Sequence, residues 1–238
     1  NDKNLDLVVG APGTSFPSAG RSQGSVLVYR GRGDGRFVDT PTWAIHLDPS
    51  IRVDNAAFGS GLDVVRDSAN GPAVLLVRAP FFTSKAPTGA ALAQAGGMWT
   101  FAPGSLGSLP QKNRVRVLTT NASSAHFYGA AANRGVGRSA ALGNVDPLPG
   151  TELVVGAVSA NAAPGTLLVF SVPQILKGTL APIAELASAS SDLEGMRVTR
   201  VGDGSSVGGL AVLAPWRTTA VGPLVGAIDF VPPSPAPI

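Results

Sequence analysis

Short apolar segments alternate with polar, glycine- and proline-rich segments along the whole chain, and one arrangement recurs four times. In each copy a short apolar strand ends in a Gly-Ala-Pro-like turn, a variable loop follows, and a glycine precedes or opens a second apolar strand. The paired segments are 7–12 with 24–29, 75–80 with 97–101, 153–158 with 165–170, and 211–215 with 225–230. This pattern predicts a series of paired β-strands.

Two further kinds of segment complete the predicted unit. Small residues with alternating polarity precede three of the turns, at 58–65, 136–142 and 194–201. Alternating segments also lie between the copies, at Trp43–Leu47, Arg114–Thr119 and Ile183–Ala187. A period of two is typical of half-exposed strands. We therefore expect units of four antiparallel strands, with the first unit lacking its innermost strand and the last lacking its outermost strand.

The composition supports an all-β protein with many turns. The 30 glycines and 20 prolines exceed average usage, and 44% apolar against 14% charged residues excludes a disordered chain. Long helical patterns are absent. A solenoid or a sandwich built from another all-β repeat remains an alternative. In the favoured arrangement, Val8, Val77, Val155 and Val212 occupy equivalent places, and Trp99 packs between two sheets.

The sequence resembles the FG-GAP repeats of integrin α-subunit propellers and their bacterial relatives. Phe58-Gly59 and Gly10-Ala11-Pro12 carry the two signatures, and the later copies are eroded. The resemblance implies a β-propeller of about four four-stranded antiparallel blades in residues 1–231, followed by a proline-rich tail or linker at 232–238. The blades would span approximately 1–50, 51–120, 121–188 and 189–231.

The family usually closes a ring of seven blades. The resemblance therefore implies a part of a larger propeller, with the missing blades supplied by upstream sequence or by another chain. A self-closed ring of four blades is the alternative.

The resemblance also implies calcium-binding loops, because the family often places Ca²⁺ between the first two strands of a blade. Ca²⁺ prefers six to eight oxygen ligands. The corresponding positions are Asp2 and Asp6 in the first copy and Asn144, Asp146, Gly150 and Glu152 in the third. Leu148 occupies a position where the family has a ligand, so calcium capacity is reduced. These residues could instead stabilise turns through their own hydrogen bonds.

Two other segments are candidate binding sites. Arg32-Gly33-Asp34 spells the tripeptide that integrins recognise, although Asp-Gly is also favoured at a hairpin tip. Trp216 and Arg217 follow the fourth Ala-Pro turn, and an exposed tryptophan there could stack on a sugar ring.

Several classes of function are not expected. The chain has no cysteine, and its two histidines, His46 and His126, lack partners at metal-ligand or nucleophile spacing. His46 is expected to face solvent on an outer strand, and His126 to lie near the start of the third blade. The basic residues are scattered, which argues against nucleic-acid binding, and no apolar stretch is long enough for a membrane helix.

We therefore expect a non-catalytic extracellular or cell-surface module for adhesion, interaction or scaffolding. It would bind protein or glycan partners through loops on one propeller face. The alternatives are a glycan-binding lectin-like propeller and a structural subunit of a surface filament or sheath. A non-catalytic part of a polysaccharide- or lipid-acting enzyme is a further alternative.

Overall fold

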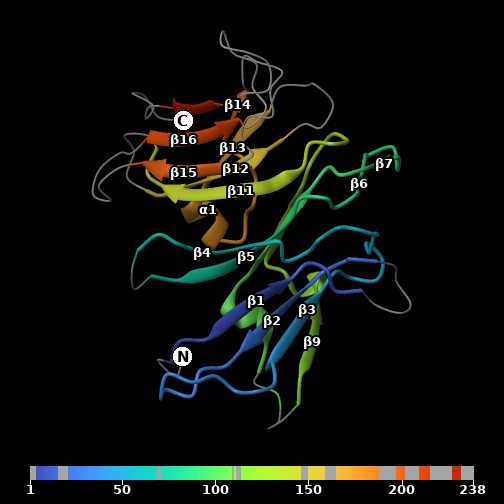
Figure 1. Cartoon of the computed structure of the whole chain (residues 1–238), viewed down its shortest axis with the longest axis vertical. Helices are drawn as coiled ribbons and strands as arrows, with labels where there is room; N and C mark the ends of the chain where they lie inside the picture. Colours follow the sequence, from blue (N-terminus) through green and yellow to red (C-terminus); the bar gives the residue numbers. More distant parts are fainter. Residues whose placement is uncertain are drawn as a thin grey trace.

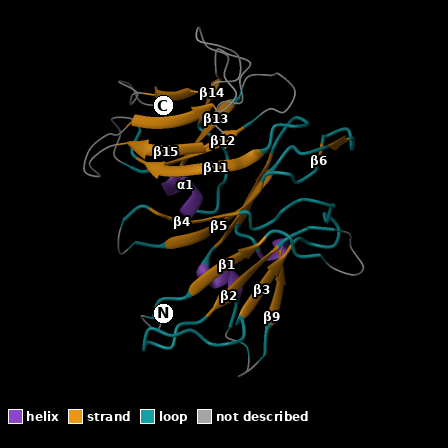
Figure 2. Cartoon of the chain, viewed as in Figure 1, coloured by secondary structure: helices purple, strands orange, loops and turns teal. Residues whose placement is uncertain are grey.

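The computed structural model describes residues 4–15, 21–68, 71–108, 110, 114–145, 150–158, 165–187, 197–201, 209–214 and 227–231. Within these residues the chain forms three four-stranded sheets, one three-stranded sheet and one two-stranded hairpin. Helix is limited there to α1 (Val172–Leu176) and two 3₁₀ turns, η1 (Pro103–Leu106) and η2 (Thr120–Ala122). The all-β prediction is confirmed (Figure 2).

The four larger sheets follow one another along the chain, except that the last strand of the first sheet comes after three strands of the second. In order across each sheet, the first contains β1 (Leu7–Ala11), β2 (Ser25–Tyr29), β3 (Trp43–His46) and β9 (Arg116–Thr119), and the second β10 (Ala125–Tyr128), β8 (Gly97–Phe101), β5 (Ala73–Ala79) and β4 (Gly61–Arg66). The third contains β11 (Val136–Gly143), β12 (Glu152–Ala157), β13 (Thr166–Ser171) and β14 (Ala184–Ala187), and the fourth β15 (Arg197–Val201), β16 (Gly209–Ala214) and β17 (Ala227–Val231). The small hairpin of β6 (Ser84–Lys85) and β7 (Ala91–Leu92) lies within the loop between β5 and β8.

One predicted strand belongs to a different sheet. Arg114–Thr119 was expected as the outer strand of the second unit, but β9 pairs in parallel with β3 of the first sheet. The outer place in the second sheet is taken by β10, which pairs with β8 and contains His126. The expectation that His126 begins the third unit is therefore wrong. Leu118 of β9 packs with the core between the first two sheets, which holds β9 at the first sheet.

The sheets pack face to face in sequence order, with one apolar cluster between each neighbouring pair. Val26, Ile45 and Phe58 pack against Val77 and Trp99, between the first and second sheets. A second cluster joins the second and third sheets, and a third cluster joins the third and fourth. Figure 1 shows the series, with β1, β2 and β3 of the first sheet in blue at one end and the last sheet in orange to red at the other. Trp99 is fully buried between two sheets, as predicted.

Side chains alternate between the two faces of each central strand. In β12, Leu153 and Val155 point toward the second sheet, whereas Val154 points toward the fourth. In β13, Leu168 points toward the second sheet and Val169 points toward the fourth. Both faces of the third sheet are thus buried, which explains why β12 and β13 read as continuous apolar runs in the sequence.

The strand pair on either side of each Ala-containing turn has the same register in all four sheets. In each sheet, the alanine at the turn pairs with the first residue of the partner strand beyond the loop. The pairs are Ala11 with Ser25, Ala79 with Gly97, Ala157 with Thr166, and Ala214 with Ala227. The register between β4 and β5 also matches that between β11 and β12, from Gly61–Arg78 and Ser139–Gly156 onward.

The first and second sheets are joined by a set of backbone hydrogen bonds. The N–H groups of Asn55, Ala57 and Phe58 donate to the carbonyls of Arg21, Ser22 and Gln23, at 2.8, 3.2 and 2.9 Å. Gly24 and Phe58 also form a parallel bridge. We call this set the first junction, because it ties the loop after β1 to the segment that enters β4.

The second and third sheets are joined by a matching set, which we call the second junction. Its donors are Asn133, Gly135 and Val136, and its acceptors are Ala93, Gln94 and Ala95, at 2.7, 2.9 and 3.0 Å. A parallel bridge joins Gly96 to Val136. Corresponding residues share a left-handed backbone, as in Asn55 and Asn133, with φ of 57° and 59°. The two junctions therefore have the same local geometry although only a few of their side chains are alike.

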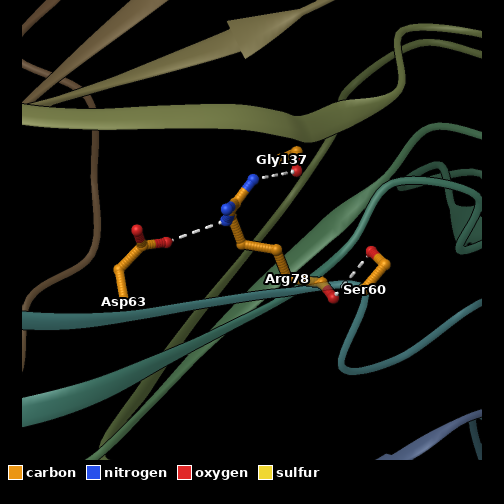
Figure 3. A network of polar contacts seen from close by, with 4 residues as sticks. All are labelled: Ser60, Asp63, Arg78 and Gly137. Atoms are coloured by element: carbon orange, nitrogen blue, oxygen red, sulfur yellow. Dashed lines mark hydrogen bonds and ion pairs between the residues drawn. The ribbon is translucent and has the colours of Figure 1, made fainter. Parts of the chain in front are cut away.

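Arg78 forms a polar link between the second and third sheets (Figure 3). Its guanidinium donates to Asp63 Oδ2 at 3.0 Å and to the Gly137 carbonyl at 2.9 Å. Ser60 Oγ donates to the Arg78 carbonyl at 3.4 Å. A side chain at Gly61 would overlap the guanidinium, so this glycine leaves the space that the arginine fills. Arg78 stands where the first and third turns have Gly10 and Gly156, so the altered turn still links adjacent sheets.

Candidate interaction site

The tripeptide Arg32-Gly33-Asp34 lies at the tip of a hairpin beyond β2. Gly31 bridges Phe37, and the Arg32 N–H donates to the Arg36 carbonyl at 2.9 Å. Asp34 Oδ1 accepts the Arg36 N–H at 3.0 Å, and Gly33 and Gly35 have φ of 84° and 80°. The turn interpretation of this segment is confirmed. The adhesive interpretation stays a prediction, with all three residues exposed at the surface.

A groove of about 830 Å³ separates this hairpin from the edge strand β1. Leu7, Val9 and Tyr29 line it from the sheet, and Phe37 lines it from the hairpin. Arg32 lies along the groove and is paired with Asp39 through a contact of 3.3 Å. Both of these side chains are well exposed, so the ion pair contributes little to stability. The groove therefore combines an apolar floor with a charged rim.

The groove is part of a wider apolar surface on the first sheet, which we call the outer face. Strand pairing places Val9, Leu27, Ala44 and Val117 in one row across β1, β2, β3 and β9. The neighbouring residues Val26, Ile45 and Leu118 point the other way, into the core shared with the second sheet. Val9 is 37% exposed and Val117 is 63% exposed. No described residue range forms a sheet that covers this face.

The register identifies which valines are equivalent, and it corrects the expectation that named Val8. Val77, Val155 and Val212 each lie two residues before the alanine at the turn, and all are fully buried against the preceding sheet. The residue in that place in the first sheet is Val9, whereas Val8 packs toward the second sheet. The outer face is thus the counterpart of faces that the other sheets bury.

Two of the proposed calcium ligands accept backbone hydrogen bonds. Asp6 Oδ1 accepts the Gly31 N–H at 3.0 Å, and Glu152 Oε2 accepts the Val145 N–H at 2.9 Å. Glu152 is buried and Gly150 is exposed, with φ of 152°. Glu152 therefore helps to close the loop between β11 and β12, which is the turn role that the sequence left open, whereas Asp6 links the segment before β1 to the end of β2.

The remaining candidates only partly fall within the described residues. Asn144 is half-buried and follows β11. Asp2, Asp146, Trp216 and Arg217 lie outside the described residues, as does the tail at 232–238. In the described part of the chain, no group of three or more His, Cys, Asp or Glu residues is placed to hold a metal ion.

The two histidines occupy different environments. His46 is half-buried at the end of β3, contrary to the expectation that it faces solvent on an outer strand, because β9 pairs alongside β3 and takes the outer place in the sheet. Burial lowers the pKa of His46, and the nearby positive charge of Arg52 lowers it further. His126 is exposed on β10 and stacks on Tyr128, with ring centroids 4.8 Å apart.

Sequence reasoning did not single out the pair formed by the exposed Phe81 and the half-buried Arg138. The Arg138 guanidinium lies over the Phe81 ring, 4.8 Å from its centroid. Phe81 follows the second Ala-Pro turn, at the place that Trp216 holds after the fourth turn. That shared position is the signal that could have identified Phe81.

Within the described residues, no helix has the length and apolar character needed to cross a membrane.

The comparisons with known proteins add no family assignment. No protein-family model matches the chain, and no curated protein matches it significantly.

Proposed function

We propose that this chain is a section of an FG-GAP-type β-propeller that acts as a non-catalytic extracellular interaction or scaffold module. The common register at the four turns and the matching first and second junctions support successive blades of one kind. The eroded copies keep this geometry even where Arg78 replaces glycine. The resemblance to the propeller family supplies the extracellular setting.

The exposure of Val9 is the observation that carries the interaction role. Its counterparts Val77, Val155 and Val212 are fully buried against a preceding sheet, whereas Val9 is 37% exposed. Leu27 and Tyr29 likewise stand in the places of Trp99 and Phe101, which pack between sheets. Burying apolar area of this kind stabilises by about 25 cal/mol per Å². The partner we propose for the outer face is therefore another β-sheet, from elsewhere in the same protein or from a second chain.

Placing charges on the outer face tests this role. Exposed apolar patches mark interaction sites. In the isolated chain, where no partner sheet is present, the outer face should therefore drive reversible self-association. Val9→Lys combined with Val117→Lys should abolish that association in sedimentation velocity over a hundredfold range of protein concentration. Val64→Lys is the matched control, since Val64 is 48% exposed but lies on β4. A wild-type chain that stays monomeric throughout would contradict the proposed role of this surface.

Calcium binding at the loops of Asp6 and Glu152 is a further part of the proposal. Millimolar calcium should raise the melting temperature relative to chelator, since a ligand that binds only the folded state stabilises it. Glu152→Gln should reduce that rise while leaving the carbonyl oxygen able to accept the Val145 N–H. Magnesium serves as the control cation, because it prefers a smaller, octahedral site. An identical melting temperature with calcium and with chelator would remove calcium from the account.

A further inference from the structure

A cavity of about 560 Å³ lies at the outer edge of the second sheet, away from the outer face. The edge strand β10 and η2 form one wall, and the segment 178–181 that precedes β14 forms another. Ile51, which follows β3, contributes from the first sheet. The cavity therefore lies where the edges of three sheets approach one another, and its volume is within the range of small-molecule sites.

The cavity contains an aromatic platform that is fixed from behind. His126 and Tyr128 are stacked, with an interplanar angle of 23°. Tyr128 packs against Phe82 and Trp99, whose ring centroids lie 5.2 and 5.5 Å from its own. Burial raises the pKa of Tyr128, although its contact with Trp99 acts in the opposite direction, so the phenol is uncharged at neutral pH. The platform thus presents the exposed His126 ring, supported by the uncharged Tyr128 ring that Phe82 and Trp99 hold in place.

Hydroxyl and amide groups surround the platform. Thr120, Asn121, Ser123 and Thr179 all line the cavity. Two of them are held by Asp48, since Asn121 Nδ2 donates to its carboxylate at 2.6 Å and Thr120 Oγ1 accepts its N–H at 3.0 Å. The polar groups of η2 are therefore fixed in place before any ligand binds, which lowers the entropic cost of binding.

The lining carries no formal acidic or basic side chain other than the imidazole. None of its twelve residues is Asp, Glu, Lys or Arg. A charged ligand would lose hydration here without gaining an opposite charge, and a wholly apolar ligand would cover hydroxyl and amide groups without satisfying them. The lining therefore favours a neutral ligand with both an apolar face and many hydroxyl groups.

We propose that this cavity binds a neutral saccharide unit, with one face of the sugar ring on His126 and its hydroxyl groups toward Asn121, Ser123 and Thr179. The aromatic ring provides a large contact area at low entropic cost, while the amide and hydroxyl groups donate and accept hydrogen bonds. A peptide strand added to the edge of β10 would be the competing occupant. The four-residue length of β10 disfavours it, because short edge strands offer few backbone groups for pairing.

The test is a glycan array that carries neutral and acidic oligosaccharides, followed by titration with the array's best neutral saccharide. The wild-type chain should bind neutral saccharides and discriminate against sialylated and sulfated ones. His126→Ala, which removes the platform, and Thr179→Trp, which fills the cavity from an exposed position, should each weaken binding by about tenfold or more. Phe81→Ala should bind as the wild type does, because Phe81 is an exposed aromatic residue outside the cavity.

Three results would overturn the proposal. They are the absence of any neutral saccharide binding, a preference for the acidic oligosaccharides, and wild-type affinity in both cavity variants. Melting temperatures of His126→Ala and Thr179→Trp within a few degrees of the wild type would show that any lost binding reflects the cavity. If one variant unfolds, the other decides the outcome. Saccharide binding is tested independently of the outer face, because the outer face belongs to the first sheet and the cavity lies at the edge of the second.

Discussion

Replacing Trp99 with alanine is expected to lower the free energy of unfolding by about 3–5 kcal/mol. Trp99 is fully buried between the first and second sheets. Its ring contacts Phe58 and Phe82 edge-on, with centroids 5.4 and 5.2 Å away. Alanine would leave a cavity in the core that joins the two sheets and would remove these contacts together with the one to Tyr128. Denaturant unfolding monitored by far-UV circular dichroism measures the loss.

Two companion variants interpret the Trp99 result. Trp99→Phe keeps a ring in the same core and should lose less stability than Trp99→Ala. Phe81→Ala removes an aromatic side chain that is 37% exposed, and it should change stability by less than about 1 kcal/mol. Equal losses in Trp99→Ala and Phe81→Ala would show that the core between the two sheets is not packed as described.

Alanine at Gly24 is expected to destabilise the protein by about 2–5 kcal/mol. Gly24 has φ of 89°, a left-handed conformation that costs a residue with a Cβ about 1–2 kcal/mol. A Cβ there would also overlap the Phe58 carbonyl across the first junction, which adds a packing cost. Gly96→Ala should cause a similar loss, because its Cβ would overlap the Val136 backbone across the second junction.

Gly35→Ala is the matched control for the junction variants. Gly35 has a similar φ of 80°, but a Cβ there would meet no atom within 4 Å. Its loss should therefore be limited to the conformational cost of about 1–2 kcal/mol. Thermal or denaturant unfolding of the three variants separates the conformational cost of the left-handed backbone from the packing cost at the junctions. If Gly24→Ala and Gly96→Ala were no more destabilised than Gly35→Ala, the close approach at the junctions would be refuted.

The sequence was sufficient to predict the strands but not all of their neighbours. Apolar runs that end at Ala11, Ala79, Ala157 and Ala214 identified one strand in each sheet, because turn chemistry and hydrophobic pattern are local signals. The alternation in Arg114–Thr119 correctly predicted a strand. It could not show that β9 pairs in parallel with β3, since pairing depends on where a long connection returns the chain.

The same limit explains what sequence reasoning found of the candidate sites. The hairpin at Gly33 and Gly35 was predictable because glycine favours the left-handed backbone of a tight turn. The apolar character of Val9 was visible too, but an exposed valine and a buried one look alike in sequence. The cavity beside His126 combines residues near 51, 120–128 and 178–181, and only the fold brings those segments together.

The account rests on successive sheets joined by the same backbone hydrogen bonds, and amide hydrogen exchange measured by NMR tests this most directly. The N–H groups of Asn55 and Phe58 at the first junction, and of Asn133 and Val136 at the second, all donate to a neighbouring loop. We expect these four amides to exchange as slowly as amides in the centre of β5, since they open only when neighbouring sheets separate. Exchange at the rate of an unprotected amide, at either junction, would contradict the account.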